Sequence, residues 1–224
     1  VNGLLMAPLG TSVTWYVLFA RTARVIAYSP ASRWVSDFEQ ARDGRLPWYE
    51  VLRRPGVRFG RSDPNLDPGG YFTVMLFQLA ELFYNLPGLR EDVLGGDVNP
   101  EQVLPTEMLR TGLETGQLDA MVVYRNTAIE KRLPYIELPN ELNFSDPALR
   151  DAYARATFTT DKGHTFRGVP VFYSATIPAR APNPAAASAF VKFLLSEQSR
   201  RAMYERGFLD APALGGRSER AVPN

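Results

Sequence analysis

Residues 70–84, GYFTVMLFQLAELFY, constrain the fold most strongly, because they are apolar on nearly every side of the helix that they would form. A helix of that kind is buried rather than amphipathic, so other elements must cover it. Pro87 and Gly88 mark its end. The chain can supply that cover, since its 224 residues are 45% hydrophobic, enough for one large domain or two smaller lobes.

Short apolar strands alternate with helices along the rest of the chain. Runs rich in β-branched and aromatic residues predict strands at 13–19, 24–28, 57–62 and 120–125, and within 166–178. Capping residues and breakers predict further helices around 47–54, at 106–116 and at 183–207. Alternating helices and short apolar strands indicate an α/β fold.

The helix expected at 183–207 has the clearest signals. Asn183 suits the N-cap, Pro184 suits the first helical position, and Gly207 suits the end. Four large apolar side chains of this helix are expected to point inward: Phe190, Phe193, Leu194 and Leu195.

Composition excludes several kinds of partner and site. Lys and Arg together number 25 against 24 Asp and Glu, a net charge of +1, which gives no reason to expect nucleic acid or an anionic membrane as a partner. The chain has no cysteine and one histidine, so a thiol nucleophile and the common zinc sites are not indicated. No apolar run is long enough to span a membrane.

No set of residues combines a nucleophile with its base, so no catalytic residue and no enzyme are predicted. His164 lies in a polar loop and is expected to be exposed. Glu137 and Glu141 are separated by the helix breaker Pro139, which favours a solvated edge over a catalytic pair.

A stiff polar loop, SDPNLDPGG at 62–70, leads directly into the apolar helix. Asp and Asn beside Pro are ordinary turn formers, so two successive turns are one interpretation. The alternative is an anion site, because Gly69 and Gly70 allow close approach to the backbone at a helix N-terminus, where N–H groups lack internal partners. The loop matches neither the Walker motif nor G-x-G-x-x-G, so a nucleotide is not indicated.

PTEML at 105–109 repeats this arrangement at a second helix start. Thr106 is expected there either as a plain N-cap or as a donor to an anion. Tyr124, at the end of a buried strand, is either a core residue or a hydroxyl donor to an oxyanion. Arg125 can pair with the ligand or with Asp67.

Four segments resemble, in order, the periplasmic molybdate/tungstate-binding proteins of ABC transporters, and in particular their tungstate-type branch. The resemblance covers most of residues 13–215. The segments are VRFGRSDPNLDPGGY at 57–71, LAELFYNLPGL at 79–89, LETGQLDAMVVYRNTAIEKRLPYIELPNELNFSD at 113–146 and FYSATIPARAPNPAAASAFVKFLLSEQSRRAMYERGF at 172–208.

The resemblance implies the α/β fold of type II periplasmic solute-binding proteins, in which two lobes of β-sheet flanked by helices close on a ligand in a hinge cleft. The expected division gives 1–58 to the remainder of the first lobe and a hinge strand. Residues 59–168 form the second lobe with the anion-binding loop, and 169–224 return to the first lobe. The hinge strands are expected at 57–62 and 169–177.

The resemblance also implies ligand contacts at the DP-x-GY turn, at the second helix start and at the strand tyrosine. Arg125 is added to these contacts from its place beside Tyr124. The predicted ligand-binding residues are Asp67, Gly69, Gly70, Tyr71, Thr106, Tyr124 and Arg125. No cofactor and no bare metal cation are expected, because the only metal is the centre of the bound molybdate or tungstate.

The predicted function is capture of a tetrahedral oxyanion, molybdate or tungstate, for an ABC importer. The implied partner is the transporter permease, and a monomer is expected, in the periplasm or outside the cell, with a lipid anchor as one way of holding it there. Two alternatives stay open. One is a binding protein of the same fold for sulfate, an organic acid or a metal ion, and the other is a sensor domain of that fold.

Two features depart from the tungstate-type branch. Val123 stands where that branch commonly has an acidic residue that completes an expanded coordination of the metal, so a tetrahedral oxyanion held by hydrogen bonds is expected instead. The serine-containing anion loops of the first lobe are not found before Val13. Residues 1–12 are therefore interpreted as the end of a first-lobe segment that the chain otherwise lacks.

Overall fold

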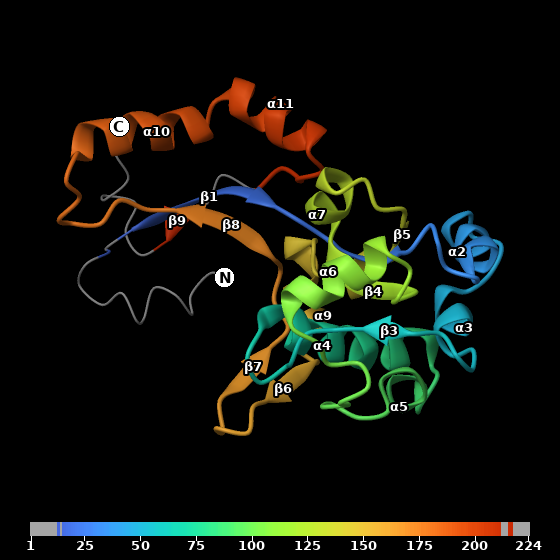
Figure 1. Ribbon diagram of the computed structural model, residues 1–224. Helices are drawn as coiled ribbons and strands as arrows, with labels where there is room; N and C mark the ends of the chain where they lie inside the picture. The colour runs from blue at the N-terminus through green and yellow to red at the C-terminus, as the bar shows by residue number, and fades with distance from the viewer. Residues whose placement is uncertain (1–12, 14, 212–214, 217–224) are drawn as a thin grey trace. The chain divides into compact units, whose positions relative to one another are not determined.

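The computed structural model describes residues 13, 15–211 and 215–216, and the expectation for residues 1–12 lies outside them. The chain divides into two compact units (Figure 1). The smaller unit comprises residues 1–23 and 171–224, and the larger comprises residues 24–170.

The larger unit is built on a four-stranded sheet in the order β3-β4-β2-β5. β2 and β4 are antiparallel, with Arg24 opposite Tyr124, while β3 runs parallel to β4. β2 lies between β4 and β5, and all of its residues are buried. The strands are β2 (Arg24–Tyr28), β3 (Phe59–Gly60), β4 (Ala120–Tyr124) and β5 (Tyr135–Glu137).

Helix α4 (Pro68–Tyr84) is the apolar helix that the sequence predicts. Its middle, residues 72–77, is fully buried, which confirms the prediction there. The prediction is wrong in the last turn of the helix, where Leu82 and Phe83 are about half exposed. The helix ends at Asn85, whose left-handed backbone (φ 52°) stops it before Pro87.

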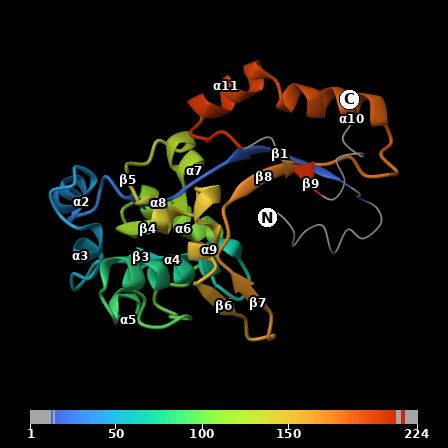
Figure 2. The same ribbon diagram turned by 180° about the vertical axis from the view of Figure 1, so that it is seen from behind.

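The remaining elements of the larger unit are short. The hairpin β6 (Thr157–Thr159) and β7 (Thr165–Arg167) extends from it in both views (Figures 1 and 2). No helix in the described ranges is long and apolar enough to cross a membrane. The other helices are α2 (Val35–Arg42), α3 (Trp48–Leu52), α5 (Leu89–Leu94), α6 (Thr106–Glu114), α7 (Arg125–Glu130), α8 (Asn140–Asn143), η2 (Pro147–Leu149) and α9 (Arg150–Tyr153).

The smaller unit is a three-stranded antiparallel sheet accompanied by two helices. The strands lie in the order β8-β1-β9, with bounds Phe172–Ala175, Tyr16–Arg21 and Gly215–Gly216. The single helix expected at 183–207 is instead two, α10 (Pro184–Leu194) and α11 (Glu197–Glu205). Asn183 caps α10 by accepting from the N–H of Ala186, as the sequence predicts.

The inward face predicted for this helix is wrong at three of its four residues, since only Leu194 is half-buried. Phe190 is 60% exposed and Phe193 is 47% exposed, and Leu195 also faces solvent. The physical reason is that α10 packs on the sheet through Val191, which joins a small buried cluster with Trp15 and Val17.

The two units do not follow the division expected from the sequence. That division gave residues 24–58 to the first lobe, whereas the structure places β2, α2 and α3 in the larger unit. The reason is the pairing of β2, which is hydrogen-bonded to β4 on one side and to β5 on the other. The boundaries therefore fall at 23/24 and 170/171 instead of 58/59 and 168/169.

Candidate anion-binding site

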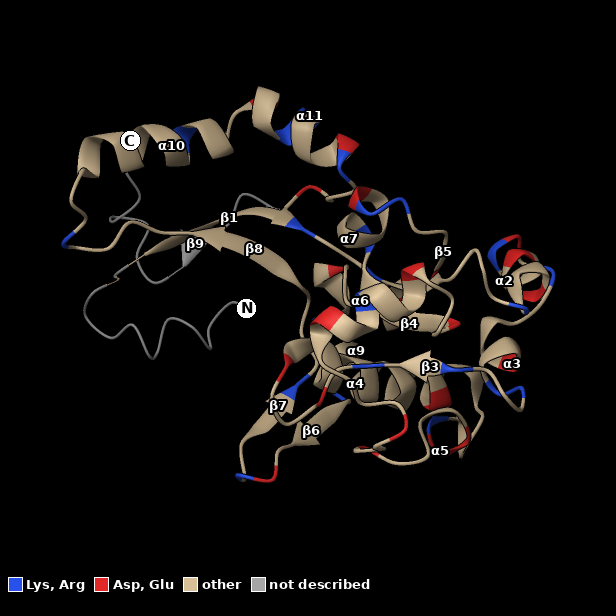
Figure 3. Cartoon of the chain, in the orientation of Figure 1, with Lys and Arg blue, Asp and Glu red and all other residues tan. Residues whose placement is uncertain are grey.

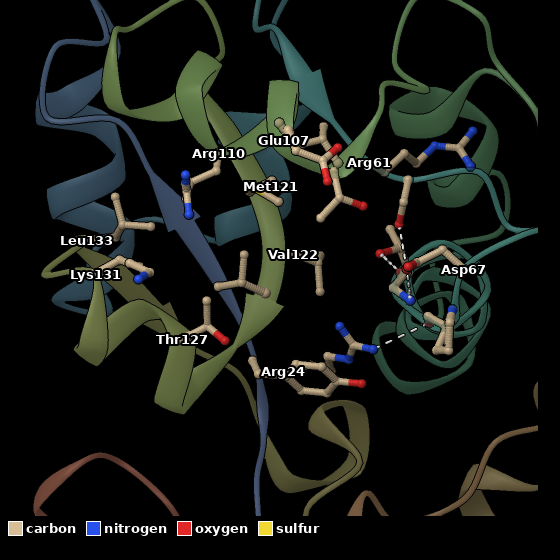
Figure 4. Close-up of a pocket in the computed structure, with 18 residues that line it drawn as sticks. Arg24, Arg61, Asp67, Glu107, Arg110, Met121, Val122, Thr127, Lys131 and Leu133 are labelled. Carbon is tan, nitrogen blue, oxygen red and sulfur yellow. Dashed lines mark hydrogen bonds between the residues drawn. The ribbon is translucent and has the colours of Figure 1, made fainter. Parts of the chain in front are cut away.

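A cavity of about 490 Å³ opens within the larger unit, where the starts of α4 and α6 meet the face of β4 (Figure 4). Its volume falls in the range of roughly 300–1,000 Å³ that is common for small-molecule sites. Every residue that lines it belongs to residues 24–170, so this unit forms the cavity by itself.

Asp67, Gly69, Thr106 and Tyr124, all predicted as ligand-binding residues, line this cavity. The structure thus gathers the DP-x-GY turn, the second helix start and the strand tyrosine around one space, although they are far apart in sequence.

Three predicted residues lie elsewhere. Gly70 is buried beneath the loop, where an added Cβ would lie 2.5 Å from the carbonyl oxygen of Ser62. The ring of Tyr71 stacks on Phe166 with the ring centroids 4.4 Å apart. Arg125 forms an ion pair with Glu137 at 2.8 Å, and none of the three lines the cavity.

The start of α4 is closed by its own cap. The Asp67 carboxylate accepts from the N–H of Gly69 at 2.5 Å and from the hydroxyl of Ser62 at 2.9 Å. The N–H groups of Gly70 and Tyr71 donate to the Asp67 carbonyl oxygen. The expectation that the first N–H groups of this helix lack internal partners is therefore wrong, and the stiff loop serves to hold the cap.

The start of α6 is open. Its N-cap position is Pro105, which has no side chain able to cap, and Thr106 is the first helical residue rather than the cap that the sequence allowed. Within the described residues no hydrogen bond uses the N–H groups of Thr106 and Glu107 or the Thr106 hydroxyl. These exposed donors border the cavity and carry the positive end of the α6 dipole.

Burial raises the pKa of the Tyr71 phenol above its ordinary value. Desolvation raises the pKa of Tyr71 to about 12, with the neighbouring Tyr124 adding to the rise and Arg24 opposing it. Tyr71 thus lies near the cavity-lining pair of Tyr124 and Arg24 without lining the cavity itself.

Arg24 is the residue that the sequence interpretation missed. It begins β2, opposite Tyr124, and is only 2% exposed. Its guanidinium carbon lies 3.8 Å from the centroid of the Tyr124 ring and 5.1 Å from that of Phe72. In Figure 4 the guanidinium lies between β4 and the start of α4. A charged residue heading the otherwise apolar strand RVIAY was the available signal.

The charges around the cavity favour an anion. Its cationic side chains are Arg24, Arg61, Arg110 and Lys131, whereas its carboxylates are Asp67 and Glu107. Asp67 is already engaged in the cap of α4. The excess of positive charge attracts an anion more than a bare cation.

A cation site would need further carboxylates beside Asp67, but Glu137 and Glu141 do not line this cavity. Glu137 is exposed and paired with Arg125, and Glu141 is exposed as well. Val123 is buried on the cavity wall, so this position presents an apolar surface to the cavity.

Known relatives share most of this chain. A solute-binding protein of Petrotoga mobilis is 38% identical over 199 residues, covering 86% of this chain and 60% of that protein. The molybdate/tungstate-binding protein WtpA of Thermococcus kodakarensis is 34% identical over 225 residues, covering 90% of this chain and 62% of that protein. The chain thus spans about three fifths of the length of these relatives.

Solved structures share the fold at low sequence identity. The periplasmic molybdate-binding protein of Azotobacter vinelandii superposes with a TM-score of 0.55 at 13% identity, covering 94% of this chain and 74% of that one. The sulfate-binding protein SubI of Mycobacterium tuberculosis gives 0.52 at 16% identity, with 87% and 58% covered. These likenesses confirm the mixed α/β fold of type II binding proteins. A family model described as bacterial extracellular solute-binding protein matches residues 7–209, and the chain belongs to this family.

Proposed function

We propose that the chain is the ligand-capturing part of an extracytoplasmic solute-binding protein that delivers molybdate or tungstate to an ABC importer. The observation that carries this proposal is the cavity, which joins the open start of α6, the Tyr124 side chain and an excess of cationic groups. The names of relatives such as WtpA support the choice of ligand.

Binding in this proposal involves no covalent chemistry. Donors at the start of α6 and the Tyr124 hydroxyl replace the water around the oxyanion, and the helix dipole favours its negative charge. Four oxygens of roughly 30 Å³ each, the share of a water molecule, make about 120 Å³. The cavity of about 490 Å³ holds such an anion with room for ordered water.

The proposal extends to the setting of the protein. Its partner is the permease of the transporter, and its place is the periplasm or the cell exterior, with or without a lipid anchor. Residues 169–177 stay a candidate hinge strand for closure on the ligand, because they include the unit boundary at 170/171, whereas residues 57–62 lie within the larger unit. Figure 3 shows basic and acidic residues interspersed among the elements of each unit, in keeping with a net charge of +1 and a small anion rather than a nucleic acid as ligand.

The test is thermal unfolding of the purified chain, and of the full gene product in parallel, with and without molybdate, tungstate, sulfate and phosphate. A ligand at ~100 times its dissociation constant stabilises the fold by about 2.7 kcal/mol. A rise in melting temperature with molybdate and tungstate supports the proposal. A rise with sulfate alone would support the alternative ligand, and no rise with any anion in either protein would overturn the proposal.

Tyr124→Phe tests the site itself. The variant keeps the ring over Arg24 but loses the hydroxyl, so oxyanion binding should weaken by about 1–3 kcal/mol. The melting temperature without ligand should stay close to that of the unchanged chain. Unchanged affinity for the oxyanion would remove Tyr124 from the site.

A further inference from the structure

Arg24 carries a positive charge that the described residues do not balance. No carboxylate in the described ranges forms an ion pair with it, although its relative exposure is only 2%. Its one hydrogen bond there is long, 3.4 Å from Nη2 to the carbonyl oxygen of Pro68, and its Nε has no acceptor. Burying a charge without a partner is costly, so such an arrangement needs a compensating group.

Arg61, on the same cavity, shows what a satisfied buried arginine looks like. It is also 2% exposed, but each of its nitrogens has an acceptor. Nη1 and Nη2 donate at 2.6 Å to the carbonyl oxygens of Asp97 and Gly96, and Nε donates to the side chain of Gln102 at 3.1 Å. Arg61 therefore supports a loop, whereas Arg24 is held by ring contacts that leave its charge available.

The rings hold Arg24 in place without neutralising it. Stacking over Tyr124 at 3.8 Å fixes the plane of the guanidinium, and the contact with Phe72 covers it from the side of α4. Cation–π contacts contribute less than the cost of an unpaired buried charge. The group is thus positioned before any ligand arrives.

We infer that Arg24 is the charge-recognition residue of the cavity, the fixed cation that pairs with a doubly charged tetrahedral oxyanion seated between the starts of α4 and α6. This rests on the proposed function and adds to it the residue that selects for ligand charge. The donors of α6 and Tyr124 recognise oxygen atoms, while Arg24 distinguishes a dianion from a monoanion of the same shape.

The charged groups that face Arg24 agree with this role. Asp67 lines the same cavity beyond ion-pair distance, and its carboxylate is used by Ser62 and Gly69. Glu107, at the start of α6, is exposed to solvent that screens it. Neither carboxylate takes the place of an anionic ligand at the guanidinium.

The binding test compares tungstate with perrhenate, which is also tetrahedral but carries one negative charge fewer. In titration calorimetry, Arg24→Met should weaken tungstate binding by roughly 10- to 100-fold, the effect of losing a charge-assisted contact. Perrhenate binding should weaken less, so the preference for the dianion falls. Arg24→Lys keeps the charge but loses the planar group, so it should retain the preference at reduced affinity.

Arg110→Met is the matched control, because it removes the same charge from an exposed position on the same cavity. Its effect on tungstate affinity should stay under about threefold, since solvent and salt screen the charge. Equal effects of Arg24→Met and Arg110→Met would overturn the inference, because the cavity would then respond only to its total charge.

A ligand-free measurement tests the inference independently of the ligand. Arg24→Met removes an unbalanced buried charge, so its melting temperature without anions should equal or exceed that of the unchanged chain. Arg61→Met leaves three acceptors unsatisfied and should lower it. A fall for Arg24→Met as large as that for Arg61→Met would show a structural role and overturn the inference.

The two proposals fail in different ways. If neither the unchanged chain nor the full gene product responds to an oxyanion, the proposed function is overturned, and the ligand-free comparison still decides whether Arg24 is an unbalanced charge. If the unchanged chain binds tungstate and Arg24→Met binds it equally well, the proposed function stands and the role of Arg24 is overturned.

Discussion

The two helix starts that border the cavity differ in whether their N–H groups are already in use. At α4, Asp67 accepts from Gly69 through its side chain and from the next two N–H groups through its carbonyl oxygen. At α6, Pro105 offers no side-chain cap, and the N–H groups of Thr106 and Glu107 have no partner among the described residues.

The difference indicates that the start of α4 supports the cavity wall, whereas the start of α6 keeps N–H groups free for a ligand. Strong capping signals, an Asp at the N-cap and a Pro after it, indicate a helix start whose N–H groups are hydrogen-bonded within the cap. A weakly capped start that borders a cavity keeps its donors for a ligand. In the proposed site, α4 is accordingly the rigid wall, and α6 is the source of donors.

The largest expected effect is on the α4 side, in Gly70→Ala. The added Cβ would lie 2.5 Å from both the carbonyl oxygen of Ser62 and the nitrogen of Pro64. These are backbone atoms of the loop, so the loop must move, at a cost of about 1–3 kcal/mol. Urea unfolding followed by circular dichroism measures this loss.

Gly69→Ala is the matched control for that variant. Its Cβ would meet side-chain atoms, the Asp67 carboxylate at 2.6 Å and the Ser62 hydroxyl at 2.9 Å, which can move aside. The loss of stability should therefore be smaller than in Gly70→Ala. A larger loss in Gly69→Ala would mean that the cap, rather than backbone packing, holds the loop.

Asp67→Ala should lower the free energy of unfolding by about 0.5–2 kcal/mol, because it removes the cap of α4. Oxyanion affinity should not fall, since the change removes a negative charge from the cavity and frees the N–H of Gly69. Thermal unfolding and calorimetric titration on the same samples separate the two effects.

Asp67→Asn sharpens this result, because the amide oxygen can still accept from Gly69. Most of the lost stability should return in this variant. A strong loss of oxyanion affinity in Asp67→Asn would show instead that the carboxylate contacts the ligand, as the resemblance to the tungstate-type branch implies.

The sequence predicted the elements of the site better than their roles. The apolar run of α4, the strand ending at Tyr124 and the helix starting near Thr106 were all expected, and each borders the cavity. These patterns are local, so periodicity and capping residues reveal them.

The burial of Arg24 and the capping of the N–H groups at the start of α4 could not be predicted in the same way. The environment of Arg24 depends on its register opposite Tyr124, a residue 100 positions further along the chain. Whether the Gly69 N–H at the start of α4 is capped depends on the side-chain conformation of Asp67. The exposed face of α10 was missed for a similar reason, because an apolar pattern does not show how much of its surface other elements cover.

Thr106→Ala tests the α6 side, where a smaller effect is expected. The hydroxyl caps nothing, so the free energy of unfolding should change by less than about 0.5 kcal/mol. Oxyanion binding should weaken by about 0.5–1.5 kcal/mol, the contribution of one hydrogen bond. This is the reverse of the pattern expected for Asp67→Ala, and a drop in stability without a change in affinity would make the two helix starts equivalent.

The smallest effect is expected for Tyr71→Phe, at the first turn of α4. The ring is stacked on Phe166 and does not line the cavity, so tungstate affinity at pH 8 should stay within about threefold. Burial raises the pKa of Tyr71 to about 12 from 10.0, so the neutral phenol favours the folded state. That contribution is complete below pH 10 and is lost as the pH rises towards 12, so stability should decline less over this interval in Tyr71→Phe than in the unchanged chain. Denaturant unfolding between pH 8 and pH 12 measures this, with parallel curves below pH 10 as the internal control. A loss of affinity as large as that of Tyr124→Phe would instead place the Tyr71 hydroxyl against the ligand and make the start of α4 a second recognition element.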